Sequence, residues 1–213
     1  MVPWPNLLAF ALASALLIVI PGPSVLFVLG RSISLGRRGG LLSVLGNALG
    51  MLPAIAAVAL GIGALVAQSV VVFTIVKVIG ALYLVFLGIQ AIRHRKTRAM
   101  PDASAAPRST FRLLLEGFVV GITNPKTIAF FVAVLPQFVD HAAGAIAWQL
   151  AELGLLFFLL ALVMDGTWAL IAGTARDWFA RSPKRVERLG AAGGVMMIGL
   201  GGVLLVAGAD AKS

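Results

Sequence analysis

Two charged residues, Asp165 and Lys126, lie deep inside long apolar segments of this 213-residue chain. Asp165 precedes Arg176 by eleven residues, about 16 Å along a helix, and Lys126 is fourteen residues from both Arg112 and Asp140. A charge at the centre of a bilayer costs roughly 2.5–3.5 kcal/mol, so neither side chain is expected to face lipid. A central carboxylate is suited to bind a substrate ammonium group or a proton. The alternative is an Asp165–Lys126 ion pair that only holds two helices together.

Two proline motifs interrupt apolar segments that would otherwise form continuous helices. The motifs and the residues that follow them are Pro21, Gly22, Pro23 and Ser24 in the first, and Thr123, Asn124, Pro125 and Lys126 in the second. Proline disrupts a helix interior but suits the first position of a new helix, and Asn124 is a typical N-cap. Each motif is therefore expected to start a half-helix near the midplane, whose free N–H groups and positive dipole end can bind a carboxylate. The alternative is a pair of proline kinks whose backbone groups are satisfied by neighbouring helices.

Six apolar segments must position these residues. They cover residues 7–29, 41–67, 70–92, 113–139, 146–175 and 189–209, and each is long enough to cross about 30 Å of hydrocarbon as a helix. The composition agrees, because 60% of the residues are apolar and 12% are charged, about half the charge of a soluble domain. A water-soluble enzyme is thereby excluded. The sequence predicts an all-α integral membrane protein with a single transmembrane domain over residues 1–213.

The basic residues predict how these helices are oriented. The links after the first, third and fifth segments carry three, six and five Lys or Arg residues, whereas the second and fourth links carry none. This alternation follows the positive-inside rule and predicts that both termini lie outside. Topology also explains most of the net charge of +9, so no nucleic-acid partner is expected. With no cysteine and with only His94 and His141, no metal site and no cofactor are expected either.

The two halves of the chain repeat one pattern. Residues 1–95 and 113–213 each hold three segments, and a basic linker over residues 93–112 joins them. Three spans per half require opposite topologies, so the sequence predicts two inverted three-helix repeats with spans 1 and 4 interrupted. Paired interruptions of this kind mark the binding site of transporters. Asn47, in the second segment, is a further candidate for a polar group in that site.

These motifs resemble those of the lysine/homoserine exporter superfamily, of LysE/RhtB type. The likeness covers nearly the whole chain and is seen in residues 21–50, 76–93 and 121–138 and around Asp165. It implies a multi-pass exporter of amino acids or their derivatives in a bacterial inner membrane, driven by proton antiport with alternating access. Glu116 departs from the family pattern, and its place near the inner boundary predicts a solvated side chain.

A binding hypothesis follows from the motifs and the resemblance. The substrate carboxylate is expected on the half-helix starts at Pro23 and at residues 124–126, while Asp165 binds the substrate ammonium group and a proton in turn. The partners are then an amino acid, protons and the lipid bilayer, and a homodimer is compatible with so small a carrier. Two alternatives stay open: a divalent metal-ion exporter, for which Asp165 beside Lys126 is a poor ligand set, and an integral membrane structural or enzymatic protein.

Overall fold

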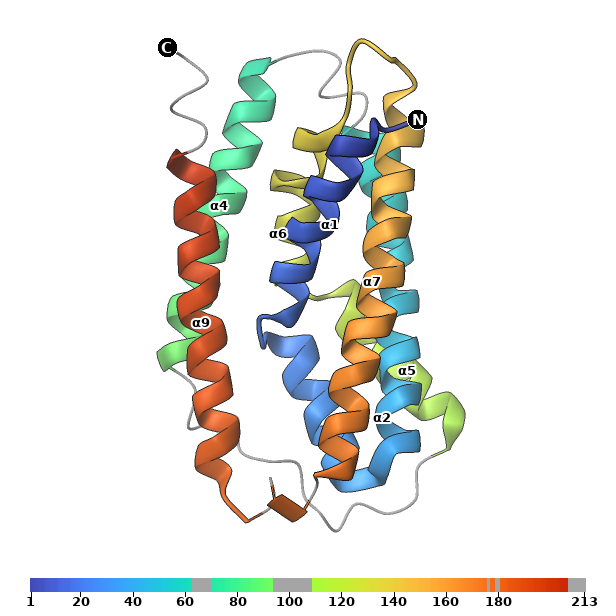
Figure 1. Ribbon diagram of the computed structural model, residues 1–213, viewed down its shortest axis with the longest axis vertical. Coiled ribbons are helices and arrows are strands. Elements are labelled where there is room, and N and C mark those ends of the chain that lie inside the picture. The colour runs from blue at the N-terminus through green and yellow to red at the C-terminus, as the bar shows by residue number, and fades with distance from the viewer. Residues whose placement is uncertain (63–69, 94–108, 176, 179–180, 207–213) are drawn as a thin grey trace.

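The computed structural model describes residues 1–62, 70–93, 109–175, 177–178 and 181–206. Within these ranges every regular element is helical (Figure 1). The elements are α1 (Trp4–Val19), α2 (Pro23–Ala57), the π-helical turn η1 (Val58–Ile62), α4 (Val70–Arg93), α5 (Thr110–Ile122), α6 (Pro125–Ala133), the 3-10 turn η2 (Leu135–Phe138), α7 (Ile146–Thr174) and α9 (Pro183–Val206). The predicted all-α class is confirmed.

Helix α2 contains a reversal of the chain. Gly36 has φ 73° and ψ −175°, a conformation open almost only to glycine. The halves of α2 on either side, residues 23–35 and 37–57, run in opposite directions (Figure 1). The first predicted link is thus a turn at one glycine, and α2 carries the end of the first predicted segment and most of the second.

Among the described residues, three helices are long and apolar enough to cross a membrane on length and composition: Pro23–Gly61, Ile146–Thr174 and Lys184–Val206. The first of these reverses at Gly36, so it is not one straight span. The pair α5 and α6–η2 adds a fourth candidate, bent by 44°. Helix α1 has 16 residues, which is short for a full span but fits a half of an interrupted one. Several apolar helices are therefore confirmed, while six spans in two inverted repeats remain a prediction.

Both proline motifs interrupt helices at the expected residues. Helix α1 ends at Val19, and α2 starts at Pro23 with Gly22 as its N-cap. Helix α5 ends at Ile122, and α6 starts at Pro125 with Asn124 as its N-cap. Proline at the first helical position has no N–H to lose there, which is why each new helix begins with it.

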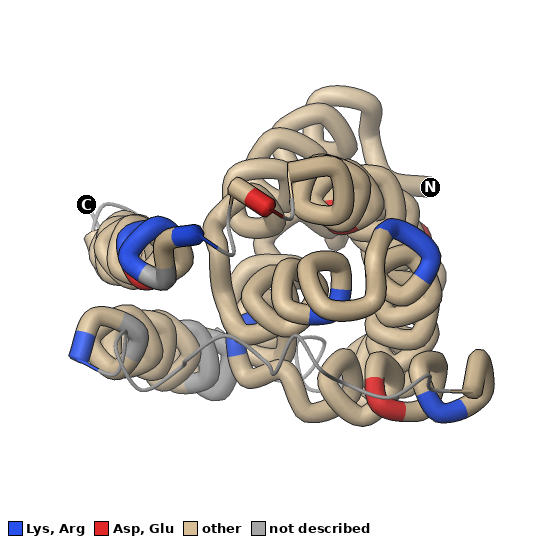
Figure 2. The backbone as a smooth tube through the Cα atoms, turned by 90° about the horizontal axis from the view of Figure 1, so that it is seen from below, with Lys and Arg blue, Asp and Glu red and all other residues tan. Residues whose placement is uncertain are grey.

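Helix α2 packs against both α5 and α7, and α1 packs on α7. Helix α4 pairs with α9 beside this group and reaches it through α6 (Figure 2). Glycines bring α2 and α5 together: an added Cβ would lie 2.2 Å from Leu114 O at Gly46 and 2.0 Å from Asn47 O at Gly121. The small-residue spacings therefore mark close backbone contact.

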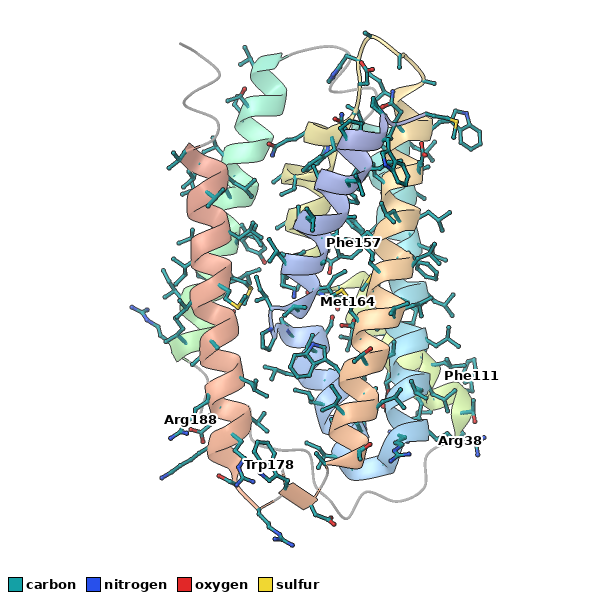
Figure 3. All side chains as sticks on the ribbon, viewed as in Figure 1. Arg38, Phe111, Phe157, Met164, Trp178 and Arg188 are labelled. Atoms are coloured by element: carbon teal, nitrogen blue, oxygen red, sulfur yellow. The ribbon has the colours of Figure 1, made fainter. Side chains whose placement is uncertain are left out.

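Two labelled arginines lie toward one end of the bundle (Figure 3). They are Arg38 and Arg188, and the chain reverses at Gly36 at the same end.

At the other end, where α1 begins, Gln149 is fully buried and joins α7 to the preceding loop. Its Oε1 accepts from Asp140 N at 2.8 Å, and its Nε2 donates to Asp140 O at 2.8 Å and Gly144 O at 2.7 Å. Sequence reasoning did not single out this residue.

Candidate functional site

The two helix interruptions meet around a small buried cavity. Its lining combines polar and apolar side chains, Ser24, Asn124, Lys126, Thr127 and Asp165 with Ile18, Val25, Met51, Phe157 and Ala161. The cavity volume of about 10 Å³ is close to the smallest that holds one water molecule. Figure 3 shows Phe157 and Met164 on α7 at the middle of the bundle, and Asp165 directly follows Met164 in this helix.

A chain of hydrogen bonds joins the polar residues. Asn47 Nδ2 donates to Asp165 Oδ2 at 3.4 Å, and Ser24 Oγ donates to Asn47 Oδ1 at 3.1 Å. Asn124 Nδ2 donates to Ser24 Oγ at 2.7 Å and to Thr127 Oγ1 at 2.9 Å. The chain therefore connects α7, both halves of α2 and the start of α6. Thr127 is a member that sequence reasoning missed, although its position three residues after an N-cap could have indicated it.

Asp165 is the buried acid of this cavity, with 3% of its surface exposed. Its Oδ2 accepts the bond from Asn47, whereas Oδ1 is buried and has no hydrogen-bond partner among the described residues. A buried acceptor without a donor loses the free energy of its hydration without compensation. The arrangement is suited to a ligand that brings a donor, such as an ammonium group or a proton.

Lys126 is also buried, and its ammonium group is held by backbone oxygens. Nζ donates to Leu17 O at 3.0 Å and to Ile20 O at 2.9 Å. Within the described part of the chain, no hydrogen bond or direct ion-pair contact joins Lys126 to Asp165, although both line the cavity and their charges interact. The opposite charges of the two side chains attract each other across the cavity without a direct contact, so the ion-pair alternative stays a prediction.

The remaining candidate residues lie around the cavity rather than in its wall. Pro23 and Pro125 begin α2 and α6, and Gly22 is an N-cap. Pro21 packs on α9, where an added Cβ at Gly193 would lie 2.1 Å from Pro21 O. Thr123 is exposed, and its Oγ1 donates to Val119 O at 2.6 Å in its own helix.

Glu116 is paired, not simply solvated as the sequence suggested. Its Oε2 lies 2.6 Å from Arg31 Nη2, and its Oε1 lies 3.0 Å from Arg112 Nε. The Glu116 side chain is 25% exposed and that of Arg31 is 14% exposed. This ion pair joins residues 23–35 of α2 to α5, a contact that hydropathy cannot reveal.

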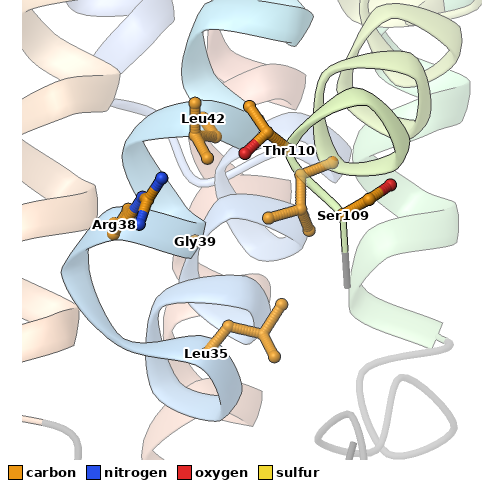
Figure 4. Close-up of a pocket in the computed structure, with 7 residues that line it drawn as sticks. Leu35, Arg38, Gly39, Leu42, Ser109 and Thr110 are labelled. Atoms are coloured by element: carbon orange, nitrogen blue, oxygen red, sulfur yellow. The ribbon is translucent and has the colours of Figure 1, made fainter. Parts of the chain in front are cut away.

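A second, larger pocket lies beside the turn at Gly36 (Figure 4). It has a volume of about 330 Å³, and Leu35, Arg38 and Leu42 line it together with Ser109 and Thr110 at the start of α5. In the described ranges, it shares no lining residue with the central cavity.

Among the described residues, no group of three or more His, Asp or Glu side chains is placed to hold a metal ion, so the metal-exporter alternative gains no donor set.

Comparison with known proteins places this chain in a family. Residues 15–208 match the model of the LysE type translocator family. The chain is 37% identical over 202 residues to an uncharacterized membrane protein of Vibrio cholerae, covering 94% of this chain and 96% of the relative. It is 32% identical over 196 residues to the homoserine/homoserine lactone efflux protein of Salmonella typhimurium, covering 92% and 94%.

A third relative is the leucine efflux protein of Klebsiella pneumoniae, 28% identical over 193 residues, with 87% of both chains covered. No solved structure matches the chain. The family model and the relatives cover the helix interruptions and Asp165 alike. The chain belongs to the LysE type translocator family, whose members are membrane transporters and not enzymes.

Proposed function

We propose that this protein exports amino acids or their derivatives across the bacterial inner membrane by proton antiport. The family and the efflux proteins among its relatives support the transport class and the kind of substrate. The observation that carries the mechanism is Asp165 Oδ1, a buried carboxylate oxygen that has no hydrogen-bond partner among the described residues and lies in a cavity between two helix starts. An exporter of amino acids needs such an acceptor for the substrate ammonium group.

The two ends of an amino acid match the two kinds of group around the cavity. The starts of α2 and α6 direct backbone N–H groups and positive dipole ends toward the centre, which favours the substrate carboxylate. Asp165 offers its oxygens to the ammonium group. Since one carboxylate cannot hold an ammonium group and a proton together, substrate release and protonation alternate. This competition is the basis of antiport.

The size of the cavity calls for alternating access. A volume of about 10 Å³ holds one water molecule and no amino acid. The helices around it must therefore separate on one side of the membrane at a time for the substrate to enter and leave. In the proposed orientation, the first residues of α1 face the outside and the Gly36 turn faces the cytoplasm.

The test is transport by the purified protein in proteoliposomes. L-Leucine, L-homoserine and a panel of other labelled amino acids are offered with and without an imposed pH gradient. We expect at least one amino acid to move against its gradient, and a protonophore to stop that movement. Transport that ignores both the pH gradient and the protonophore would remove proton antiport. No movement of any amino acid by a folded protein would remove the proposed function itself.

The Arg31–Glu116 ion pair is expected to close the cytoplasmic side of the site. Arg31 follows Ser24 by seven residues and Glu116 precedes Asn124 by eight, so the pair lies about 10–12 Å inward of the cavity. We expect Glu116→Gln to favour the inward-open state by roughly 1 kcal/mol, about fivefold in population. The buried Ser32, changed to cysteine, reports this opening through its rate of alkylation by N-ethylmaleimide.

This labelling experiment has a clean background, because the natural chain has no cysteine. Glu152→Gln is the matched control, since Glu152 accepts from Val2 N at the other end of the bundle. It should leave the alkylation rate of the introduced cysteine unchanged. Equal rates with glutamate and glutamine at position 116 would show that the ion pair does not close this side.

A further inference from the structure

Lys126 stands at a helix position that electrostatics disfavours for a cation. It is the second residue of α6, directly after Pro125 and the N-cap Asn124. The first turn of a helix carries the positive end of the helix dipole, which repels a positive side chain. Lys126 is also only 4% exposed, so water cannot stabilise its charge. A buried cation at this place needs acceptors from another element.

Those acceptors come from the broken end of α1. The Lys126 ammonium group donates to Leu17 O and Ile20 O at 3.0 and 2.9 Å, and Ile20 is the C-cap of α1. Leu17 O also accepts from Ile20 N at 3.2 Å, and its second lone pair takes the bond from Lys126. The carbonyls at the end of a helix carry the negative end of the dipole, so a cation is favoured there. The unfavourable place of Lys126 on α6 is thus offset by a favourable one on α1.

The turn between α1 and α2 is shaped around this side chain. A Cβ added at Gly22 would lie 3.1 Å from Lys126 Cδ and Cε and 3.2 Å from Nζ. Any other residue at position 22 would therefore crowd the lysine. The Pro-Gly-Pro motif of the first half of the chain accommodates the lysine of the Asn-Pro-Lys motif of the second half.

We propose that Lys126 is a positioning residue, a built-in cation that holds α1 in its interrupted form and thereby keeps the polar site assembled. In transporters with interrupted helices, unwound carbonyls and half-helix C-terminal ends bind a coupling Na⁺. Here the ammonium group of Lys126 occupies a position of that kind. Because this cation belongs to the chain, the site does not require an alkali metal ion.

Lys126 acts on the site through the geometry of the break. The end of α1 sets where α2 begins, and Ser24, near that beginning, bonds both Asn124 and Asn47. If α1 lost its cation, Ser24 would shift and the hydrogen-bond chain to Asp165 would open. This reassigns Lys126 from direct carboxylate ligand to support of the site, and only its transport readout rests on the proposed function.

Thermal unfolding in detergent tests the proposal without transport. Lys126→Ala removes charge and volume, Lys126→Met removes the charge alone, and Lys184→Ala on α9 is the control at an exposed lysine. We expect Tm to fall by about 5–10 °C in both Lys126 variants and to stay unchanged in the control. n-Propylammonium, which reproduces Cγ to Nζ of lysine, should restore much of the loss in Lys126→Ala but not in Lys126→Met, where methionine fills the space.

The thermal experiment has two contradicting outcomes. A wild-type Tm in Lys126→Met would show that the charge is not needed. A folded Lys126→Ala protein whose Tm does not respond to n-propylammonium, with N-methyl-D-glucamine as the salt control, would show that no cation site exists at the end of α1. Either result overturns the proposal.

Transport in proteoliposomes provides the second readout. Wild-type export of L-leucine or L-homoserine should proceed at the same rate in sodium chloride and in N-methyl-D-glucamine chloride. Lys126→Ala should lose at least tenfold in rate and regain part of it with n-propylammonium. A sodium requirement of the wild type overturns the built-in cation. If the wild type moves neither amino acid, that result counts against the proposed function, and the thermal experiment decides the role of Lys126.

Discussion

Replacing Asp165 with asparagine is expected to reduce gradient-driven export at least about 100-fold while leaving the fold intact. Asparagine has nearly the same shape as aspartate and can still accept from Asn47 Nδ2. It has no negative charge for an ammonium group and cannot take up a proton. Breaking a buried charge pair costs roughly 3–5 kcal/mol, which corresponds to about two to nearly four orders of magnitude in binding.

The measurement is export from proteoliposomes under an imposed pH gradient, with substrate exchange at equal pH as a parallel assay. Asp177→Asn is the control, because Asp177 is an exposed aspartate near the basic end of the bundle. Its export rate should equal that of the wild type. Undiminished gradient-driven export by Asp165→Asn would remove Asp165 from the coupling role. Loss of the gradient response with exchange retained would limit that role to the proton.

The sequence predicted several of the residues that meet at the centre of the bundle, though not all of them. Proline motifs fix where helices start, and the position of Asp165 along its apolar segment fixes its depth. In the structure Ser24, Asn124, Lys126 and Asp165 line one cavity, and Asn47 reaches it through hydrogen bonds. These features depend on local backbone chemistry and on distance along a helix, both of which are readable from the chain.

Side-chain partners across helices were not readable in the same way. Lys126 was expected to face the substrate or Asp165, yet its ammonium group reaches the carbonyls of α1. Glu116 was expected in solvent, yet Arg31 and Arg112 hold it. Such contacts depend on helix rotation and rotamers, which hydropathy does not determine. The reversal at Gly36 was likewise not predicted, because the sequence does not show which glycine adopts a positive φ.

Replacing Gly121 with alanine is expected to have the second large effect, on stability and on transport together. The new Cβ would lie 2.0 Å from Asn47 O and 2.9 Å from Asn47 C. A backbone neighbour cannot turn aside as a side chain can, so α2 and α5 must move apart. Overpacking of this kind costs about 1–3 kcal/mol, and a loss at the upper end lowers Tm by about 5–10 °C in a chain of this size.

The displaced residue links this packing to the site. Asn47 joins Ser24 to Asp165. Its hydrogen bond to Asp165 is already long at 3.4 Å, so a shift of α2 away from α7 would break it. Gly121→Ala should therefore lose export even where the protein remains folded. Gly202→Ala on α9 is the matched control, because an added Cβ there meets no atom of the described residues within 4 Å and alanine favours a helix. Equal Tm and export rates in the two variants would show that close contact of α2 with α5 does not position Asn47.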